Sequence, residues 1–194
     1  MTRTPYLTPE QMNPEQRRIY DDIVASRGTW LNGPYAPMLH QPRLAEPAQK
    51  LGEFLRYHTS LDAQLSELAI LVVARHWDCD FEWHQHAAIA LRAGVSPDIV
   101  AAIREGRRPG VLREDESAVY EFARSLLEQH RVPSEIYDRA KRLFGVVGVV
   151  ELTGLIGYYT LIAFTLNAHE VPLPAGVAPP LTQRETRVAN GGDR

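Results

Sequence analysis

The sequence has very little cysteine: Cys79 is the only one among its 194 residues. A single thiol cannot form a disulfide within the chain, so a secreted fold held by several disulfides is excluded. The sequence also lacks a large excess of either charge: the net charge is −3, and no long run of residues carries one sign. A nucleic-acid-binding surface shows as a basic excess, so we expect no nucleic-acid partner.

The N-terminal sequence MTRTPYLTPEQ lacks the apolar core of a signal peptide, so we expect a cytoplasmic protein. Only one long apolar run is present, at 146–166, and Glu151 is its single charge. The run is long enough to span a bilayer. We interpret it instead as a buried helix or a subunit contact, because Gly148, Gly154 and Gly157 permit close helix approach. We therefore expect no membrane partner.

Strand-like alternation of apolar and polar residues is absent, so no sheet is predicted. Helix-start signals recur instead, as TPE at 8–10, NPE at 13–15 and SPD at 96–98. Each places a capping residue before a proline and an acid in the first turn. The pattern predicts an all-α protein with one helical domain over 1–174. The proline-rich and then polar segment 175–194 is expected to be a flexible tail.

The stretch CDFEWHQH at 79–86 gathers the cysteine, carboxylates and two histidines. On a helix from about Cys79 to Arg92, the residues Cys79, Glu82 and His86 share one face. Glu82 and His86, four residues apart, can form a hydrogen bond in which the carboxylate holds the imidazole tautomer and raises its basicity. Glu67 lies on the preceding apolar helix and reaches the same pocket if the two helices are antiparallel.

The segment ELAILVVARHWDCDFEWHQHAAIALRAGVSPDIVAAI at 67–103 resembles the core motif of the carboxymuconolactone decarboxylase family, which includes the alkylhydroperoxidase D-type (AhpD-like) proteins. The matching positions are Glu67, Cys79, Glu82, His86, Ala90, Gly94, Val95 and Ser96. The flanks GPYAPMLHQPRLAEP and LIGYYTLIAFTLNAHEVPLP are also similar, so the resemblance covers about 30–174. It implies an AhpD-like helical domain and a homo-oligomer, either a trimer or a hexamer.

One position departs from the peroxidase branch of that family. Those proteins carry a Cys-x-x-Cys pair whose second cysteine attacks the peroxide, and Glu82 stands at that second position here. A dithiol cycle needs a resolving thiol, which this chain lacks. The sequence therefore resembles the decarboxylase-like branch, and two-cysteine peroxidase activity is not carried over.

The leading hypothesis is a cofactor-free acid–base enzyme that acts on a small carboxylate, lactone or carbonyl compound by decarboxylation or related lyase or isomerase chemistry. His86 is cast as the proton shuttle, Glu82 as its orienting carboxylate and Glu67 as a second acid or base. Arg75 and Arg56 are candidate anchors for a substrate carboxylate, because arginine binds carboxylates through two parallel hydrogen bonds. The spacing of these residues matches no zinc motif, so no metal site is predicted.

Two alternatives remain open. The first is a single-cysteine thiol peroxidase or redox protein that uses Cys79; a helix start favours the thiolate, whereas Asp78 and Asp80 disfavour it. The second is a non-catalytic oligomeric binding protein that keeps the fold. The redox alternative predicts that Cys79→Ser abolishes activity while His86→Ala only weakens it, and the leading hypothesis predicts the reverse.

Overall fold

The chain folds into helices without any strand over the residues that the computed structural model describes, 2–27 and 33–181. The predicted all-α class is confirmed. Residues 30–32 of the expected family core lie outside the described residues. The helices are η1 (Pro9–Gln11), α1 (Pro14–Arg27), α2 (Tyr35–Met38), α3 (Pro42–Tyr57), α4 (Ala63–His76), α5 (Asp80–Arg92), α6 (Pro97–Arg104), α7 (Glu114–Gln129) and α8 (Ser134–Ala168).

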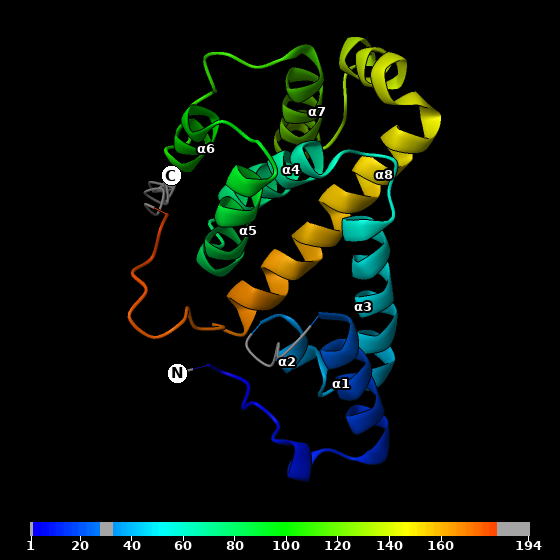
Figure 1. Cartoon of the computed structure of the whole chain (residues 1–194), viewed down its shortest axis with the longest axis vertical. Coiled ribbons are helices and arrows are strands. Elements are labelled where there is room, and N and C mark those ends of the chain that lie inside the picture. Colours follow the sequence, from blue (N-terminus) through cyan, green and yellow to red (C-terminus); the bar gives the residue numbers. More distant parts are fainter. Residues whose placement is uncertain (1, 28–32, 182–194) are drawn as a thin grey trace, which may run out of the picture.

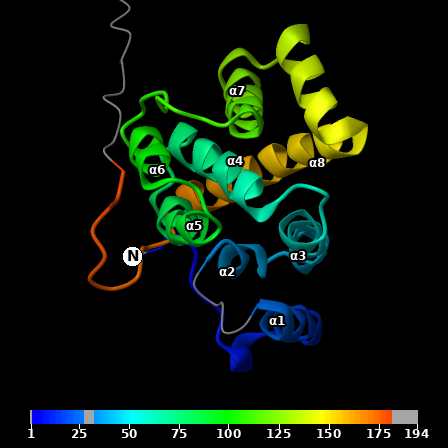
Figure 2. The same ribbon diagram turned by 45° about the horizontal axis from the view of Figure 1, so that its top comes forward.

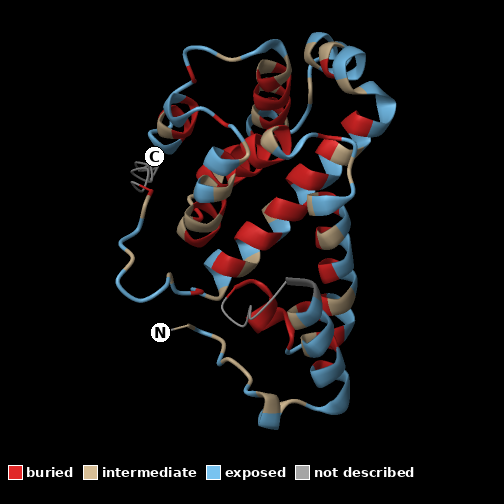
Figure 3. Cartoon of the chain, in the orientation of Figure 1, coloured by how far each residue is buried: buried red, intermediate tan, exposed pale blue. Residues whose placement is uncertain are grey.

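Helix α4 is the central element and contacts α5, α7 and α8 most extensively (Figures 1 and 2). Every residue from 65 to 75 is buried, which explains why the sequence of α4 is apolar on all sides rather than on one stripe (Figure 3). Helices α1 and α2 lie at the opposite end of the molecule from α7, and α3 runs from beside α1 to α8 (Figure 1). The single core therefore forms where α4 and α8 meet.

A short turn over 77–79 connects α4 to α5 and reverses the chain. Cys79 is the N-cap of α5, so the helix begins one residue later than expected and Asp78 is not its cap. Asp78 instead adopts a positive φ of 46° and forms an ion pair with Arg75. Helices α4 and α5 pack against each other in antiparallel directions, so Glu67 on α4 faces the first two turns of α5.

Helix α8 contains the apolar run 146–166, which the sequence predicts as a buried helix, and a preceding segment that meets it at a kink. Gly145 joins them with φ 68° and ψ −179°, a conformation that residues with a side chain rarely adopt. Helix α8 is long and apolar enough, by length and composition alone, to span a membrane. Half of its most apolar window is buried inside the protein.

The chain after α8 returns to α5. Its Leu181 side chain is buried, and the Leu181 backbone N–H donates a hydrogen bond of 2.9 Å to the Asp80 carboxylate. This contact holds the end of the described chain against the first turn of α5. Residues 182–194 of the expected flexible tail lie outside the described residues.

Candidate active site

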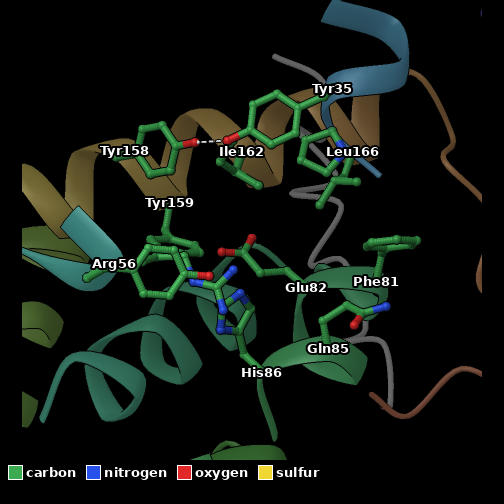
Figure 4. Close-up of a pocket in the computed structure, with 12 residues that line it drawn as sticks. Tyr35, Arg56, Phe81, Glu82, Gln85, His86, Tyr158, Tyr159, Ile162 and Leu166 are labelled. Carbon is green, nitrogen blue, oxygen red and sulfur yellow. Dashed lines mark hydrogen bonds between the residues drawn. The ribbon is translucent and has the colours of Figure 1, made fainter. Parts of the chain in front are cut away.

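A cavity of about 170 Å³ opens between α5 and the second half of α8. The end of α3 and the short helix α2 complete its walls, and Figure 4 shows Arg56, Glu82 and His86 converging on it. The labelled residues that line it are Tyr35, Arg56, Phe81, Glu82, Gln85, His86, Tyr158, Tyr159, Ile162 and Leu166. Most of the lining is aromatic or aliphatic, with few polar groups, which is the usual composition of a small-molecule site.

His86 and Glu67 form a buried hydrogen-bonded pair, with 2.7 Å between His86 Nδ1 and Glu67 Oε2. When the Glu67 carboxylate accepts this hydrogen bond, the imidazole proton lies on Nδ1. The Nε2 lone pair is then available to a molecule in the cavity that His86 lines. The pair has the geometry of a base held by a carboxylate.

This pair differs from the one that the spacing predicted. Glu82, four residues before His86, was expected to hydrogen-bond the imidazole, but Glu67 occupies that role. Spacing along α5 showed only which side chains share a face. The packing of α4 against α5 decides which carboxylate reaches Nδ1, and that contact spans nineteen positions of sequence.

Glu82 lines the cavity with 2% of its surface exposed, and neither of its oxygens is hydrogen-bonded within the described chain. Burial raises its pKa well above the ordinary value; the Cys79 thiol acts in the opposite direction, and the Glu67 carboxylate adds to the rise. Burial therefore favours the protonated form of Glu82. A protonated carboxyl group next to the His86–Glu67 pair can donate a proton to a bound molecule.

Cys79 lies at the start of α5 with 1% of its surface exposed and does not line the cavity. Burial raises the pKa of its thiol far above the ordinary value, and the adjacent Glu82 reinforces the shift. The thiolate is the nucleophilic form of cysteine. The helix start therefore does not activate this thiol, because desolvation outweighs the helix dipole.

The two candidate arginine anchors separate in space. Arg56, in the last turn of α3, lines the cavity with His86. Arg75 does not line it: its side chain pairs with Asp78 and faces a second cavity between α4, α6 and α7. Arg75 sits eight residues beyond Glu67 on α4, about 12 Å along the helix. The expected role of Arg75 as a substrate anchor is therefore wrong for this site.

Tyrosines form a wall that the sequence reasoning missed. The hydroxyl groups of Tyr35 and Tyr158 are hydrogen-bonded at 2.7 Å, and the ring of Tyr159 meets His86 edge-on at 5.0 Å between centroids. Burial raises the pKa of Tyr159 well above its ordinary value, so it remains a neutral phenol. The paired tyrosines within an otherwise aliphatic run were the available signal, because a hydroxyl buried in a core needs a partner.

No group of three or more His, Cys, Asp or Glu side chains within residues 2–27 and 33–181 is arranged to hold a metal ion. The set Glu67, Glu82 and His86 is thus a hydrogen-bonded pair with a separate carboxyl group. It brings together an imidazole, the carboxyl group hydrogen-bonded to it and a second, buried carboxyl group.

The sequence comparison agrees with the motif. Residues 42–124 match the model of the carboxymuconolactone decarboxylase family, a range that contains Glu67, Cys79, Glu82 and His86. This segment belongs to the carboxymuconolactone decarboxylase family. No curated protein matches the sequence.

Solved structures share the fold of this chain. A peroxidase-related protein with an AhpD core from Ralstonia eutropha JMP134 has a TM-score of 0.72 and 12% identity, over 88% of this chain and 91% of its own. A putative AhpD antioxidant defence protein from Agrobacterium tumefaciens has a TM-score of 0.63 and 16% identity, over 71% and 94%. The debrominase Bmp8 in complex with 2,3,4-tribromopyrrole has a TM-score of 0.70 and 17% identity, over 88% and 90%. At these identities the likeness establishes the AhpD-like helical fold.

Proposed function

We propose that the protein is an acid–base enzyme that needs no cofactor and acts on a small unsaturated carboxylate or lactone. The observation that carries the proposal is that one cavity is lined by His86, which Glu67 holds from behind, and by the buried Glu82, whose oxygens have no hydrogen-bond partner among the described residues and whose pKa is raised. In this proposal His86 takes up and returns a proton through Nε2, and Glu67 holds the imidazole in the required tautomer. Glu82 donates a proton to the reacting carbon or oxygen.

The lining of the cavity supports a planar anionic substrate. Arg56 is positively charged and lies where a substrate carboxylate enters. Tyr159 and Phe81 offer ring surfaces against which an unsaturated ring packs. The volume of about 170 Å³ suits a compact ring rather than a peptide or a long acyl chain.

Decarboxylation is the reaction that this arrangement serves best. The bond between the ring and its carboxylate breaks, carbon dioxide leaves, and the electron pair is delocalised into the neighbouring unsaturated lactone. That carbon or its conjugated oxygen then takes the proton of Glu82, and His86 restores the proton to Glu82 from solvent. In this proposal Glu67 is the carboxylate that orients His86, the role that spacing predicted for Glu82, and Glu82 is the proton donor.

A panel of small carboxylated lactones and β-keto acids tests this proposal. Carbon dioxide release and product formation are followed for the native protein and for His86→Gln, which keeps a polar side chain of similar size. The proposal expects turnover with at least one compound and a loss of about 10²-fold or more in His86→Gln. Equal turnover in the two proteins contradicts it.

The thiol alternative is tested on the same sample by counting reactive thiols before and after a peroxide challenge. One cysteine makes the count unambiguous. Because Cys79 is buried and its pKa is raised, we expect it to survive while peroxide is not consumed. Rapid loss of the thiol with repeated recovery by a small external thiol contradicts the acid–base proposal.

We also propose that copies of the chain associate and that the protein acts in the cytoplasm. The second half of α8 supports association, because it is apolar on its exposed face as well as on its buried face. The exposed members recur at alternating spacings of three and four: Val147, Val150, Gly154, Gly157, Leu161 and Phe164. This spacing is the one that packs a helix against an equivalent helix.

A further inference from the structure

Tyr159 on α8 is a buried tyrosine whose hydroxyl has no role in the reaction proposed above. The residue is 3% exposed and lines the cavity of the candidate active site. Its hydroxyl has no hydrogen-bond partner among the described residues, yet it is not enclosed as the oxygens of Glu82 are, so the O–H remains accessible from the cavity. A buried tyrosine hydroxyl usually has a partner. A molecule bound in the cavity can supply one.

The neighbouring tyrosine shows the usual arrangement. The Tyr158 hydroxyl is hydrogen-bonded to that of Tyr35 at 2.7 Å. The rings of Tyr158 and Tyr159 meet edge-on, with 5.5 Å between their centroids, so the two residues share one wall of the cavity (Figure 4). Of these two hydroxyls, the one on Tyr159 is left without a partner by the described residues.

The surroundings of Tyr159 keep the proton on its hydroxyl. Burial raises the pKa of this phenol most, the charge of Arg56 acts in the opposite direction, and the carboxyl groups of Glu67 and Glu82 add to the rise. A phenol that keeps its proton is a hydrogen-bond donor. The hydroxyl is therefore suited to bind an oxygen that carries negative charge.

Arg56 brings a positive charge to the same cavity. Its guanidinium lies over the ring of Tyr57, 5.1 Å from the centroid, and forms no ion pair with a described carboxylate. Its five N–H donors can serve a second oxygen as well as a substrate carboxylate. A positive charge and a neutral donor in one cavity stabilise negative charge on an oxygen, and the effect is strong where water is excluded.

We propose that Tyr159 and Arg56 form an oxyanion site that selects planar rings bearing an enolate or phenolate oxygen. The cavity measures about 170 Å³, and a cavity of roughly 150 Å³ holds one benzene ring. Phe81 and Tyr159 lie on opposite sides of Glu82 in Figure 4, so a ring that packs on Phe81 and turns its oxygen toward Tyr159 passes over Glu82. The reacting carbon then lies beside the proposed proton donor.

In the proposed decarboxylation this oxygen is the carbonyl oxygen of the lactone. When the bond to the carboxylate breaks, carbon dioxide leaves, and the electron pair of that bond moves through the conjugated carbon atoms onto the carbonyl oxygen. The Tyr159 O–H donates a hydrogen bond to this oxygen without losing its proton, and Glu82 then supplies the proton of the new C–H bond. This role rests on the proposed function, whereas binding of a phenolate does not.

Binding of 4-nitrophenol to the full chain tests the site, because the visible absorbance of this probe distinguishes phenolate from phenol. The bound probe is expected to be more ionised than the free probe at the same pH, since the site stabilises the anion. Tyr159→Phe keeps the ring against His86 and removes only the hydroxyl, so it is expected to weaken phenolate binding about tenfold. The proposal is overturned by the absence of saturable binding, by a bound probe no more ionised than the free one, or by equal affinity in Tyr159→Phe.

Tyr120→Phe is the matched control. Tyr120 on α7 is also buried, at 5% exposure, and burial raises its pKa against the opposing charge of Arg124, but it does not line this cavity. Phenolate affinity is expected to stay unchanged in Tyr120→Phe. An equal loss in both variants means that removal of any buried hydroxyl disturbs the protein, and it overturns the proposal.

The panel of lactones and keto acids separates the oxyanion site from the proposed reaction. If the probe binds as predicted and no panel compound reacts, the oxyanion site stands and the decarboxylation fails. If a panel compound reacts in a His86-dependent way while Tyr159→Phe binds the probe like the native protein, the reaction stands and the oxyanion site fails. With both correct, Tyr159→Phe is expected to lower kcat by on the order of 10²-fold with a smaller change in KM.

Discussion

Glu82 is a buried carboxyl whose oxygens have no hydrogen-bond partner among the described residues, an arrangement that costs stability and costs most when the group is ionised. Because burial raises its pKa, the native state retains a proton that the unfolded chain releases above about pH 4.3. The stability that this bound proton contributes to the folded protein is therefore fully present below that pH and is lost as the pH rises toward the raised pKa. The free energy of unfolding of the native protein is thus expected to fall as the pH rises through this range.

Replacing Glu82 by glutamine is expected to reduce this pH dependence. The amide is neutral at every pH, so the free energy of unfolding of Glu82→Gln falls less than that of the native protein between pH 5 and pH 8. Urea denaturation at several pH values measures the difference. Parallel stability profiles for the two proteins contradict the assignment of Glu82 as a buried neutral acid.

Glu67 and Arg56 are expected to affect different kinetic parameters. Glu67→Gln leaves the ring of His86 in place but removes the anion that supports its charged form, so kcat falls by on the order of 10² while KM changes little. Arg56→Gln removes an anchor for the substrate, so KM rises more than kcat falls. Steady-state kinetics on the substrate found in the panel measures both. A rise in KM alone for Glu67→Gln contradicts its role in orienting His86.

At the scale of single residues, the sequence predicted the members of the candidate site better than it predicted their hydrogen-bond partners. Helical spacing placed Glu82 and His86 on one face, and the motif added Glu67. Neither could show that Glu67 and not Glu82 bonds the imidazole, because the choice depends on how deeply α4 packs against α5. Arg75 was misassigned for the same reason: its position on the α4 helix turns it toward α6 and α7.

Among the elements, the contact of α3 with α8 shapes one wall of the candidate active-site cavity. A Cβ on Gly52 of α3 would overlap the ring and hydroxyl of Tyr158, so only glycine lets Tyr158 reach Tyr35. Helix boundaries were largely predictable from caps, prolines and glycines. This contact was not, since a glycine within a predicted helix does not reveal which distant side chain occupies its missing Cβ.

Gly52→Ala is expected to lower the free energy of unfolding by about 1–3 kcal/mol, because overpacking displaces the Tyr158 ring. Gly110→Ala makes the same change where a Cβ meets nothing within 4 Å, and it is expected to be nearly neutral. Denaturant unfolding of the two variants measures the contrast. Equal stabilities for both variants contradict the close contact.

For the whole molecule, the sequence predicted an all-α domain because helix signals and apolar stripes agree along the chain. It could not show that α8 remains apolar on its outer face once the core has formed. Val147 and Val150 of that face are 64% and 65% exposed in the isolated chain. An exposed apolar face of this length favours contact with another copy.

Val150→Lys is therefore expected to lower the mass of the assembly measured by size-exclusion chromatography with light scattering. Val111→Lys introduces the same charge at a valine that is 87% exposed in a loop, and it is expected to leave the mass unchanged. A native protein that is already monomeric, or an equal effect of both substitutions, contradicts association through α8.

The account as a whole depends on proton transfer at His86 rather than thiol chemistry at Cys79. The most direct measurement compares kcat/KM of Cys79→Ser and His86→Gln with that of the native protein on one substrate from the lactone and keto-acid panel. We expect Cys79→Ser to remain within about threefold of native and His86→Gln to lose on the order of 10²-fold or more. Loss of activity in Cys79→Ser with activity retained in His86→Gln would contradict the account.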